Sequence, residues 1–488
     1  MSQNISITRN FIYNLLQTVS NFLFPLITFP YVSRKLLAEG IGNVDFATSV
    51  INYFIMFASL GIPTYGIRAC AQCRNDKKKL SQTVQELFII NLFTTAIVLI
   101  IFLATLICIP KFKSNRIILL INGVSLLLNC IGMNWLYSAL EQYRYIAIRS
   151  LSFKLLALLA ILFWVNGPED TYIYAAILVF STSGANLLNF YHSRIFVSYK
   201  KEKSYNLKRH FTSIFTFFAT SVAISIYTNL DIVMLGFMCG DQQVGYYSAA
   251  LKIRSTVATI VTSLGVVILP KLLSATAASD IITFEKLYAK SLNFTFFTSI
   301  PLSIFFMICA KPCILLLAGT DFLPAVEVLL FLIPTVFFAG LSNVTGTQLL
   351  IPWGKEKQLL YSIITGAMID FLANLITIPL WGAVGAALST LIAEVAVLVI
   401  QIKVSYSFLK KQIFKMAVLK KIFSAGIAGA VLVFFLRVNR FSNLILLCVS
   451  GMLFFSIYVL CLLIMKDRFL IDVISKWILK LIRQENKL

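Results

Sequence analysis

The sequence predicts an all-α, polytopic membrane protein with about 12–14 transmembrane helices. Hydrophobic residues make up 59% of the 488 residues and charged residues only 13%, against about 45–50% and about 25% in soluble proteins. So few charged residues could not cover the surfaces of the roughly three soluble domains that this length would otherwise imply. The apolar residues also fall into runs of about 20, the length of helix that crosses a bilayer core.

Fourteen such runs follow one another along the chain, and they leave no room for a soluble domain. The first contains no acidic residue, the fifth is short and carries Arg149 and Lys154, and a Trp381–Gly382 corner alone separates the eleventh from the twelfth. The predicted spans are 10–33, 45–66, 86–109, 117–139, 149–165, 172–195, 211–236, 246–270, 290–310, 325–350, 358–380, 382–406, 419–436 and 443–465.

The positive charges are distributed unequally between the two sides of these spans. The chain has 42 Lys and Arg against 20 Asp and Glu, a formal net charge of +22. With the N-terminus inside, 32 of the 42 fall on the inner side, eight on the outer side, and Lys252 and Arg254 within a span. Cytoplasmic loops collect Lys and Arg, so we expect an even number of spans, both termini in the cytoplasm and no nucleic-acid partner. Residues 1–9 are polar and no cleavage site follows them, so the first span is expected to be retained.

A weak internal repeat predicts two lobes. The stretch EGIGNVDFATSV (39–50) resembles QQVGYYSAALKI (242–253), and each is followed by a Ser-Leu-Gly. Six spans precede the most basic loop and six follow it in the same orientation, as in transporters whose parallel repeats enclose a central cleft. The predicted parts are an N-terminal six-helix lobe at 1–197, a basic linker at 198–210, a C-terminal six-helix lobe at 211–406, two extra spans at 407–465 and a cytoplasmic amphipathic tail at 466–488.

Few residues could carry enzymatic or metal chemistry. His192 and His210 are the only histidines, and Cys70-Ala-Gln-Cys73 has no second CxxC or neighbouring histidine to complete a zinc site. No phosphate-binding GxxxxGK[ST] loop occurs. We therefore expect no enzyme, no metal and no cofactor apart from H⁺ or Na⁺ coupling.

Basic residues at membrane depth are the first candidates for function, because an unpaired charge there costs at least a few kcal/mol. Lys252 and Arg254 lie in the eighth span, Arg149 and Lys154 in the fifth, and Arg68 just past the second. A cavity with several cations suits an anionic substrate, since Arg can clamp a phosphate with two hydrogen bonds. The alternative for each is a structural ion pair, or a side chain that extends to the membrane interface.

Acidic residues at membrane depth form a second group. Asp231 lies late in the seventh span, Asp370 in the eleventh and Glu394 in the twelfth. For Asp231 and Glu394, coupling to H⁺ or Na⁺ competes with hydrogen bonding between packed helices, and the second interpretation is favoured.

Several short motifs occur in a fixed order over about residues 5–410, and none is a catalytic signature. They are Gly61-Ile-Pro-Thr-Tyr-Gly-Ile-Arg68, Asn134-Trp-Leu-Tyr-Ser-Ala-Leu-Glu141 followed by Arg149, Tyr227-Thr-Asn-Leu-Asp-Ile-Val-Met-Leu-Gly236, Val244-Gly-Tyr-Tyr-Ser-Ala-Ala250, Gln348 with Pro352-Trp-Gly-Lys-Glu-Lys357, and Gly382-Ala-Val-Gly-Ala-Ala387 with Glu394. With these motifs the chain resembles the bacterial polysaccharide-unit flippases, the O-antigen and capsule translocases of the multidrug/oligosaccharidyl-lipid/polysaccharide exporter superfamily.

The resemblance implies a MATE-like fold and a substrate of undecaprenyl-pyrophosphate oligosaccharide. Membrane lipid, a polysaccharide polymerase and glycosyltransferases are the implied partners, and the bacterial cytoplasmic membrane is the implied location. The polar head would enter a cationic cleft while the lipid tail stays in the bilayer, and the two lobes would alternate between inward-open and outward-open states.

The resemblance assigns motif positions to Arg68, Glu141, Arg149 and Asp231, and it adds Glu141 to the candidates for ion coupling. Lys252, Arg254 and Lys154 rest on their depth alone. Asn134 departs from the acidic residue that the family often has before the tryptophan, so we expect no acid-dependent role at this position.

Three other functions stay open. A multidrug exporter of the same superfamily moves cations and would need acidic residues in its N-terminal lobe, whereas the first span has none. A peptidoglycan lipid-precursor flippase is closer, although the first span lacks an internal arginine. A structural subunit without transport would tolerate loss of the charges at Lys252 and Arg254.

Overall fold

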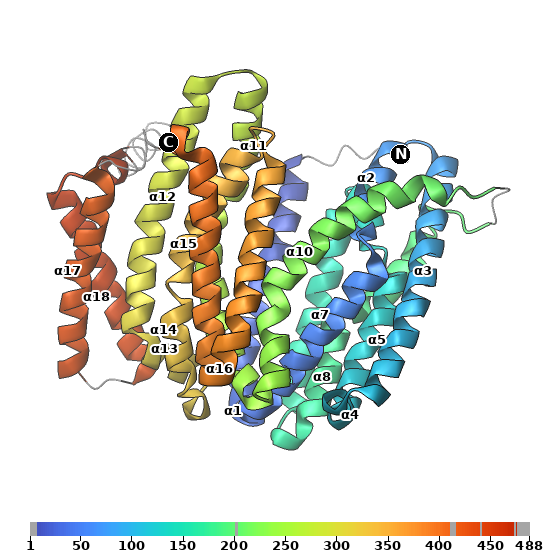
Figure 1. The fold of residues 1–488 in the computed structure, drawn as a ribbon, viewed down its shortest axis with the longest axis horizontal. Helices are drawn as coiled ribbons and strands as arrows, with labels where there is room; N and C mark the ends of the chain where they lie inside the picture. Colours follow the sequence, from blue (N-terminus) through green and yellow to red (C-terminus); the bar gives the residue numbers. More distant parts are fainter. Residues whose placement is uncertain (1–6, 201–203, 410–415, 440–441, 473–474, 476–488) are drawn as a thin grey trace, which may run out of the picture. The chain divides into compact units, whose positions relative to one another are not determined.

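The computed structural model describes residues 7–200, 204–409, 416–439, 442–472 and 475, and these form helices joined by turns and loops, without a strand among them. Figure 1 shows the ribbon, coloured along the chain. The helices are α1 (Ile7–Ser59), α2 (Ile62–Cys73), α3 (Lys77–Cys108), α4 (Pro110–Ser114), α5 (Arg116–Gly132), α6 (Asn134–Ala139), α7 (Tyr143–Trp164), α8 (Thr171–Val179), α9 (Ala185–Ser193), α10 (Lys208–Met238), α11 (Asp241–Ala277), α12 (Ile281–Ile308), α13 (Ala310–Leu317), α14 (Ala325–Leu332), α15 (Thr335–Ser342), α16 (Glu356–Leu409), α17 (Met416–Val438) and α18 (Asn443–Ile464). Short π-helical turns at Phe180–Gly184 and Asn343–Leu350 continue α8 into α9 and extend α15.

The chain forms two compact units, Met1–Ser248 and Ala249–Leu488. The first therefore includes α10 and the first turns of α11, which the sequence assigns to the second lobe. The lobe limits at 197 and 211 stay a prediction. The predicted amphipathic tail at 466–488 lies mostly outside the described residues.

Within the described residues, eleven helical segments are long and apolar enough to cross a membrane, or twelve if the two bent parts of α10 count as one span. Two of them contain breaks, because α1 has a non-helical residue at Leu37 and α16 has one at Gly382. An unbroken helix of 53 or 54 residues would be roughly 80 Å long, far more than a bilayer core of about 30 Å. Counting α1 and α16 as two spans each gives fourteen, so the predicted all-α, multi-pass membrane fold is confirmed.

A hydrogen bond proves that α16 folds back on itself. The side-chain amide of Gln401 donates to the hydroxyl of Ser362 at 3.1 Å, although 39 residues separate the two. Next to the break, the hydroxyls of Thr377 and Ser389 lie 2.7 Å apart. Figure 1 shows two arms of α16 that meet at the break, and two arms of α1 that meet in the same way.

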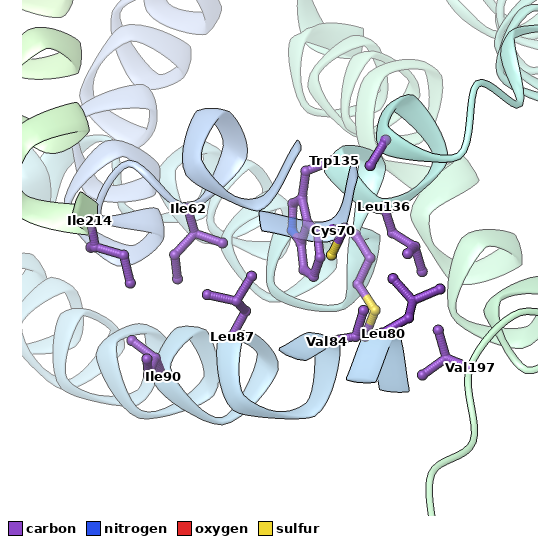
Figure 2. Packing of buried hydrophobic residues seen from close by; sticks show 12 residues of the cluster. Ile62, Cys70, Leu80, Val84, Leu87, Ile90, Trp135, Leu136, Val197 and Ile214 are labelled. Atoms are coloured by element: carbon purple, nitrogen blue, oxygen red, sulfur yellow. The ribbon is translucent and has the colours of Figure 1, made fainter. Parts of the chain in front are cut away.

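A buried cluster joins α2, α3 and α6 to the first turns of α10 (Figure 2). The aliphatic side chains of Leu80, Val84 and Leu87 line one face of α3 and pack against Cys70 and Trp135. Their spacing of three and four residues places them on one stripe of the helix. The cluster holds the beginning of α10 against the N-terminal unit.

Two glycines of the predicted repeat lie against backbone atoms in the same unit. A Cβ on Gly42 would lie 1.6 Å from the carbonyl oxygen of Asp241, and a Cβ on Gly245 would lie 2.0 Å from the carbonyl oxygen of Ala38. No side chain fits at such distances, so these positions require glycine. The carboxylate of Asp241 also forms an ion pair with Lys111 at 2.8 Å. The second arm of α1 and the start of α11 are therefore tightly packed together.

In the second unit, α17 and α18 (red in Figure 1) pack on each other and α17 packs on α12. The ammonium of Lys421, at the start of α17, is fully buried and lies 3.3 Å from the carboxylate of Asp467, which is 1% exposed. Next to it, Lys420 donates to the carbonyl oxygen of Met465 at 2.6 Å, near the end of α18. Two lysines thus attach α17 to the chain that follows α18.

Candidate functional site

Arg149 lies in α7 and is held by side-chain amides instead of a carboxylate. Its Nη2 donates to Asn134 Oδ1 at 3.0 Å, and its Nη1 donates to Asn189 Oδ1. The Nδ2 of Asn189 donates in turn to Asn134 Oδ1 at 2.9 Å and to the carbonyl oxygen of Gly132 at 2.6 Å. The amides fix the position of the guanidinium group but leave its charge uncompensated.

Stacked rings flank this arginine. The Arg149 guanidinium lies 5.7 Å from the ring centre of Tyr145, which stacks on His192 at 4.1 Å and on Tyr137 at 5.0 Å. The hydroxyl of Tyr137 donates to the carbonyl oxygen of Asn189 at 2.6 Å. The rings and amides together limit the rotamers that Arg149 can adopt. Its Nε is buried and has no hydrogen-bond partner among the described residues.

Lys154 lies on the same helix, five residues further along. Its ammonium donates to the hydroxyl of Ser20 at 2.9 Å and to the Oδ1 of Asn21, both in the first arm of α1. With a rise of about 1.5 Å per residue, Arg149 lies about 9 Å and Lys154 about 16 Å from the start of α7 at Tyr143. Two cations therefore stand at successive depths along one transmembrane helix.

In the described part of the chain, neither Arg149 nor Lys154 forms an ion pair with a carboxylate. Burying such a charge in a membrane without compensation costs at least about 2.5–3.5 kcal/mol. Each cation is instead surrounded by neutral oxygen acceptors. This arrangement favours an incoming anion, because the anion would supply the missing negative charge.

The structure places Arg68 and Glu141 differently. Arg68 is exposed on α2. Glu141 forms an ion pair with Arg74 at 2.7 Å, and about half of each side chain is exposed. The motif glutamate is thus neutralised next to the end of α2 and does not lie in the Arg149 cluster.

In the second unit, Arg254 and Glu394 are partners. The Nη2 of Arg254 lies 2.7 Å from Glu394 Oε1, with the two side chains 19% and 5% exposed, and its Nε donates to the hydroxyl of Thr335 at 2.8 Å. The sequence analysis predicts separate roles for these two residues, whereas the structure joins α11, α15 and α16 through them. Lys252 is half-buried on the same helix as Arg254.

The two remaining acidic candidates are buried. The hydroxyl of Tyr247 donates to Asp231 Oδ2, which links α10 to α11, and Asp231 is 8% exposed. Asp370 is 2% exposed in the first arm of α16. Roles for both in ion coupling stay a prediction.

The structure contains one buried charge cluster that the sequence pattern does not predict. Glu86 in α3 is fully buried, and its Oε2 accepts hydrogen bonds from Arg209 Nε at 2.9 Å and Nη2 at 2.6 Å. His210 Nε2 lies 2.8 Å from the same oxygen, and His210 Nδ1 lies 2.8 Å from the hydroxyl of Tyr65. The backbone N–H of Asn206 donates to Glu86 Oε1 at 2.8 Å. The basic residues of the 198–210 linker are the only sequence feature that points to this region. They indicate which side of the membrane the linker lies on, and not that Arg209 and His210 bind Glu86.

No group of three or more His, Cys, Asp or Glu side chains that could hold a metal ion is found among the residues that the structure describes.

Solved transporters share this fold. A structure titled "Lipid II flippase MurJ, inward closed conformation" matches with a TM-score of 0.75 at 14% identity, and covers 95% of this chain and 100% of that one. An inward-facing multidrug resistance MATE family transporter matches with a TM-score of 0.64 at 16% identity, over 82% of this chain and 99% of that one.

Two curated relatives, each named "Putative O-antigen transporter", match along most of the sequence. The one from Escherichia coli (strain K12) is 25% identical over 399 residues, 80% of this chain and 95% of the relative. The one from Shigella dysenteriae is 24% identical over 395 residues, 79% of this chain and 96% of the relative. The family model described as "Polysaccharide biosynthesis protein" matches residues 7–275. With more than half of its length matched, the chain belongs to this family of polysaccharide biosynthesis proteins.

Proposed function

We propose that this protein is a flippase that moves undecaprenyl-pyrophosphate-linked oligosaccharide repeat units across the bacterial cytoplasmic membrane by alternating access. The units would serve O-antigen, capsule or exopolysaccharide synthesis. The family, the names of the curated relatives and the flippase fold support this proposal. The charge distribution of the loops supports an orientation with both termini in the cytoplasm.

The observation that carries the proposal is the pair of uncompensated cations on α7. A pyrophosphate is an anion with several acceptor oxygens, and guanidinium and ammonium groups are its usual partners in proteins. Arg149 donates one hydrogen bond from each terminal nitrogen to an amide, so further N–H groups stay available for phosphate. Lys154 would receive the same anion about one and a half turns deeper along α7.

A cellular experiment tests the proposal. Arg149→Gln and Lys154→Gln are introduced separately and together into the gene in its own bacterium. The double variant is expected to reach the membrane, to lose surface polysaccharide and to accumulate lipid-linked repeat units. Arg116→Gln is the matched control, because it removes one charge from an exposed position at the start of α5.

Two outcomes would contradict the proposal. Wild-type amounts of surface polysaccharide in the double variant would show that neither cation handles the substrate. Rescue of a strain depleted of its lipid II flippase would assign the protein to peptidoglycan precursors instead.

A further inference from the structure

The first unit contains a pocket of about 300 Å³ between the second arm of α1, the start of α2 and the middle of α10. Pockets for small ligands begin at about this volume. Its polar lining comes from Asn52, Ser59, Ser221, Ser225 and Asn229, and no charged residue lines it. Serine and asparagine side chains in transmembrane helices commonly form hydrogen bonds with a neighbouring helix, so the hydrogen bonds of these residues decide whether they act only in helix packing.

Several of these polar groups have hydrogen-bonding capacity left over. Among the described residues, no group bonds to the side-chain amide of Asn52 or to the hydroxyls of Ser59 and Ser225. Ser221 is satisfied, because its hydroxyl donates to the carbonyl oxygen of Phe217 at 3.0 Å. A polar group that finds no partner inside a membrane is costly. Water or a polar ligand must therefore satisfy these three side chains.

The wall of the pocket that α10 forms contains a bend of this helix. The helix bends by 52° between its segments Lys208–Ile226 and Thr228–Met238, next to Ser225. At the bend, the hydroxyl of Tyr53 donates to the carbonyl oxygen of Ser225 at 3.3 Å, and the amide of Asn229 donates to the same oxygen at 3.4 Å. A side chain that bonds to a helix carbonyl can interrupt the regular i→i−4 backbone hydrogen bonds, which is an established cause of helix kinks.

We propose that this pocket binds an uncharged sugar residue of the lipid-linked substrate. The inference rests on the proposed function and names the part of the substrate that the pocket recognises. Hydroxyl and amide groups match the donors and acceptors of sugar hydroxyls. A pocket without a cation offers nothing to neutralise a pyrophosphate, which is left to Arg149 and Lys154.

Binding to the purified protein in lipid nanodiscs tests the inference with two probes. The first is the lipid-linked oligosaccharide pool extracted from the bacterium that carries the gene, and the second is undecaprenyl pyrophosphate without sugar. The wild type is expected to bind the pool more tightly. Asn52→Leu and Ser225→Ala are each expected to reduce this sugar-dependent difference by about two- to twelvefold, because a neutral hydrogen bond contributes about 0.5–1.5 kcal/mol.

The controls separate the pocket from the rest of the protein. Affinity for undecaprenyl pyrophosphate alone should stay unchanged in both variants, and Ser152→Ala, an exposed serine on α7, should change neither affinity. Equal binding of the two probes by the wild type would overturn the pocket assignment while leaving the proposed function intact, as would variants that keep the full sugar-dependent difference. Binding of neither probe would overturn both.

Discussion

At the scale of single residues, the compensation of each cation separates structural from functional candidates. Arg254 has Glu394 at 2.7 Å and Arg74 has Glu141 at 2.7 Å, so both pairs are neutral as they stand. Arg149 and Lys154 have only amide and hydroxyl partners. The sequence analysis ranks Lys252 and Arg254 as the first candidates because of their depth in a span. Depth alone does not show whether a carboxylate lies next to a cation. Compensation gives the stronger argument and places Arg149 first.

Replacement of Arg149 by lysine tests its geometry separately from its charge. A lysine keeps the charge but has one nitrogen, which cannot bond Asn134, Asn189 and a phosphate with the same planar fork. We expect Arg149→Lys to weaken binding of undecaprenyl pyrophosphate by about tenfold, the loss of one charge-assisted hydrogen bond of at least about 1.5 kcal/mol. Equilibrium binding in nanodiscs measures this, with Lys154→Arg as the tolerated counterpart. Unchanged affinity in Arg149→Lys would mean that charge alone is recognised.

Asp231 is a buried acidic candidate for ion coupling, with an exposed fraction of 8%. The hydroxyl of Tyr247 donates a hydrogen bond to its Oδ2 and links α10 to α11. If transport is coupled to H⁺ through Asp231, then Asp231→Asn should abolish the dependence of the transport rate on external pH. Transport in proteoliposomes between pH 5.5 and about 8 measures this, with Glu169→Gln as a charge-matched control at an exposed site. A pH profile equal to that of the wild type would exclude the residue.

At the scale of helices, buried charges join elements that are distant in the sequence. The carboxylate of Glu86 in α3 accepts hydrogen bonds from Arg209, from His210 and from the backbone N–H of Asn206. These residues follow it by 120 to 124 positions in the sequence. Lys421 and Asp467 do the same for α17 and the chain after α18. In both places the carboxylate is buried, so removal of its cation leaves a buried charge uncompensated. These pairs hold helix ends in place.

Glu86→Gln should release the beginning of α10. The amide that replaces the carboxylate brings N–H groups towards Arg209 and His210, which already donate, and each lost hydrogen bond to a charged group is worth about 1.5–3 kcal/mol. We expect tryptic cleavage after Arg209 to become at least about tenfold faster. Limited proteolysis followed by mass spectrometry measures the rate. Glu169→Gln should leave it unchanged, and an equally slow cleavage in both variants would contradict the role of Glu86 as an anchor.

Lys421→Met should destabilise the packing of α17. The substitution leaves the carboxylate of Asp467 buried without its cation, which costs about 3–5 kcal/mol. Thermal unfolding of the purified protein should therefore begin at a lower temperature. Lys403→Met removes an exposed lysine from α16 and should have little effect. The double variant Lys421→Met, Asp467→Leu should recover most of the loss, and failure to recover would mean that Lys421 acts through other contacts.

At the scale of the whole molecule, the spans could be predicted because a bilayer demands runs of about 20 apolar residues. The break between two spans at Gly382 is also predicted from the sequence, because a glycine follows a tryptophan there. Side-chain pairing could not be predicted, because Glu86 and His210 are 124 residues apart and hydropathy does not say which helices touch. The neutral pocket lined by Asn52 and Ser225 could not be predicted either, because serine and asparagine are common in transmembrane helices as packing residues.

The orientation of the whole molecule is the last prediction, and it rests on the positions of 42 basic residues. Cytoplasmic loops keep Lys and Arg because short positively charged segments are not moved across the membrane. A green fluorescent protein, which folds only in the cytoplasm, should be active after Ser204 and after Ser279. Alkaline phosphatase, which is active only outside, should be active after Ser114 and after Gly240. Should the phosphatase instead be active after Ser204, the substrate would meet Arg149 from the outer leaflet, and the proposed direction of transport would be reversed.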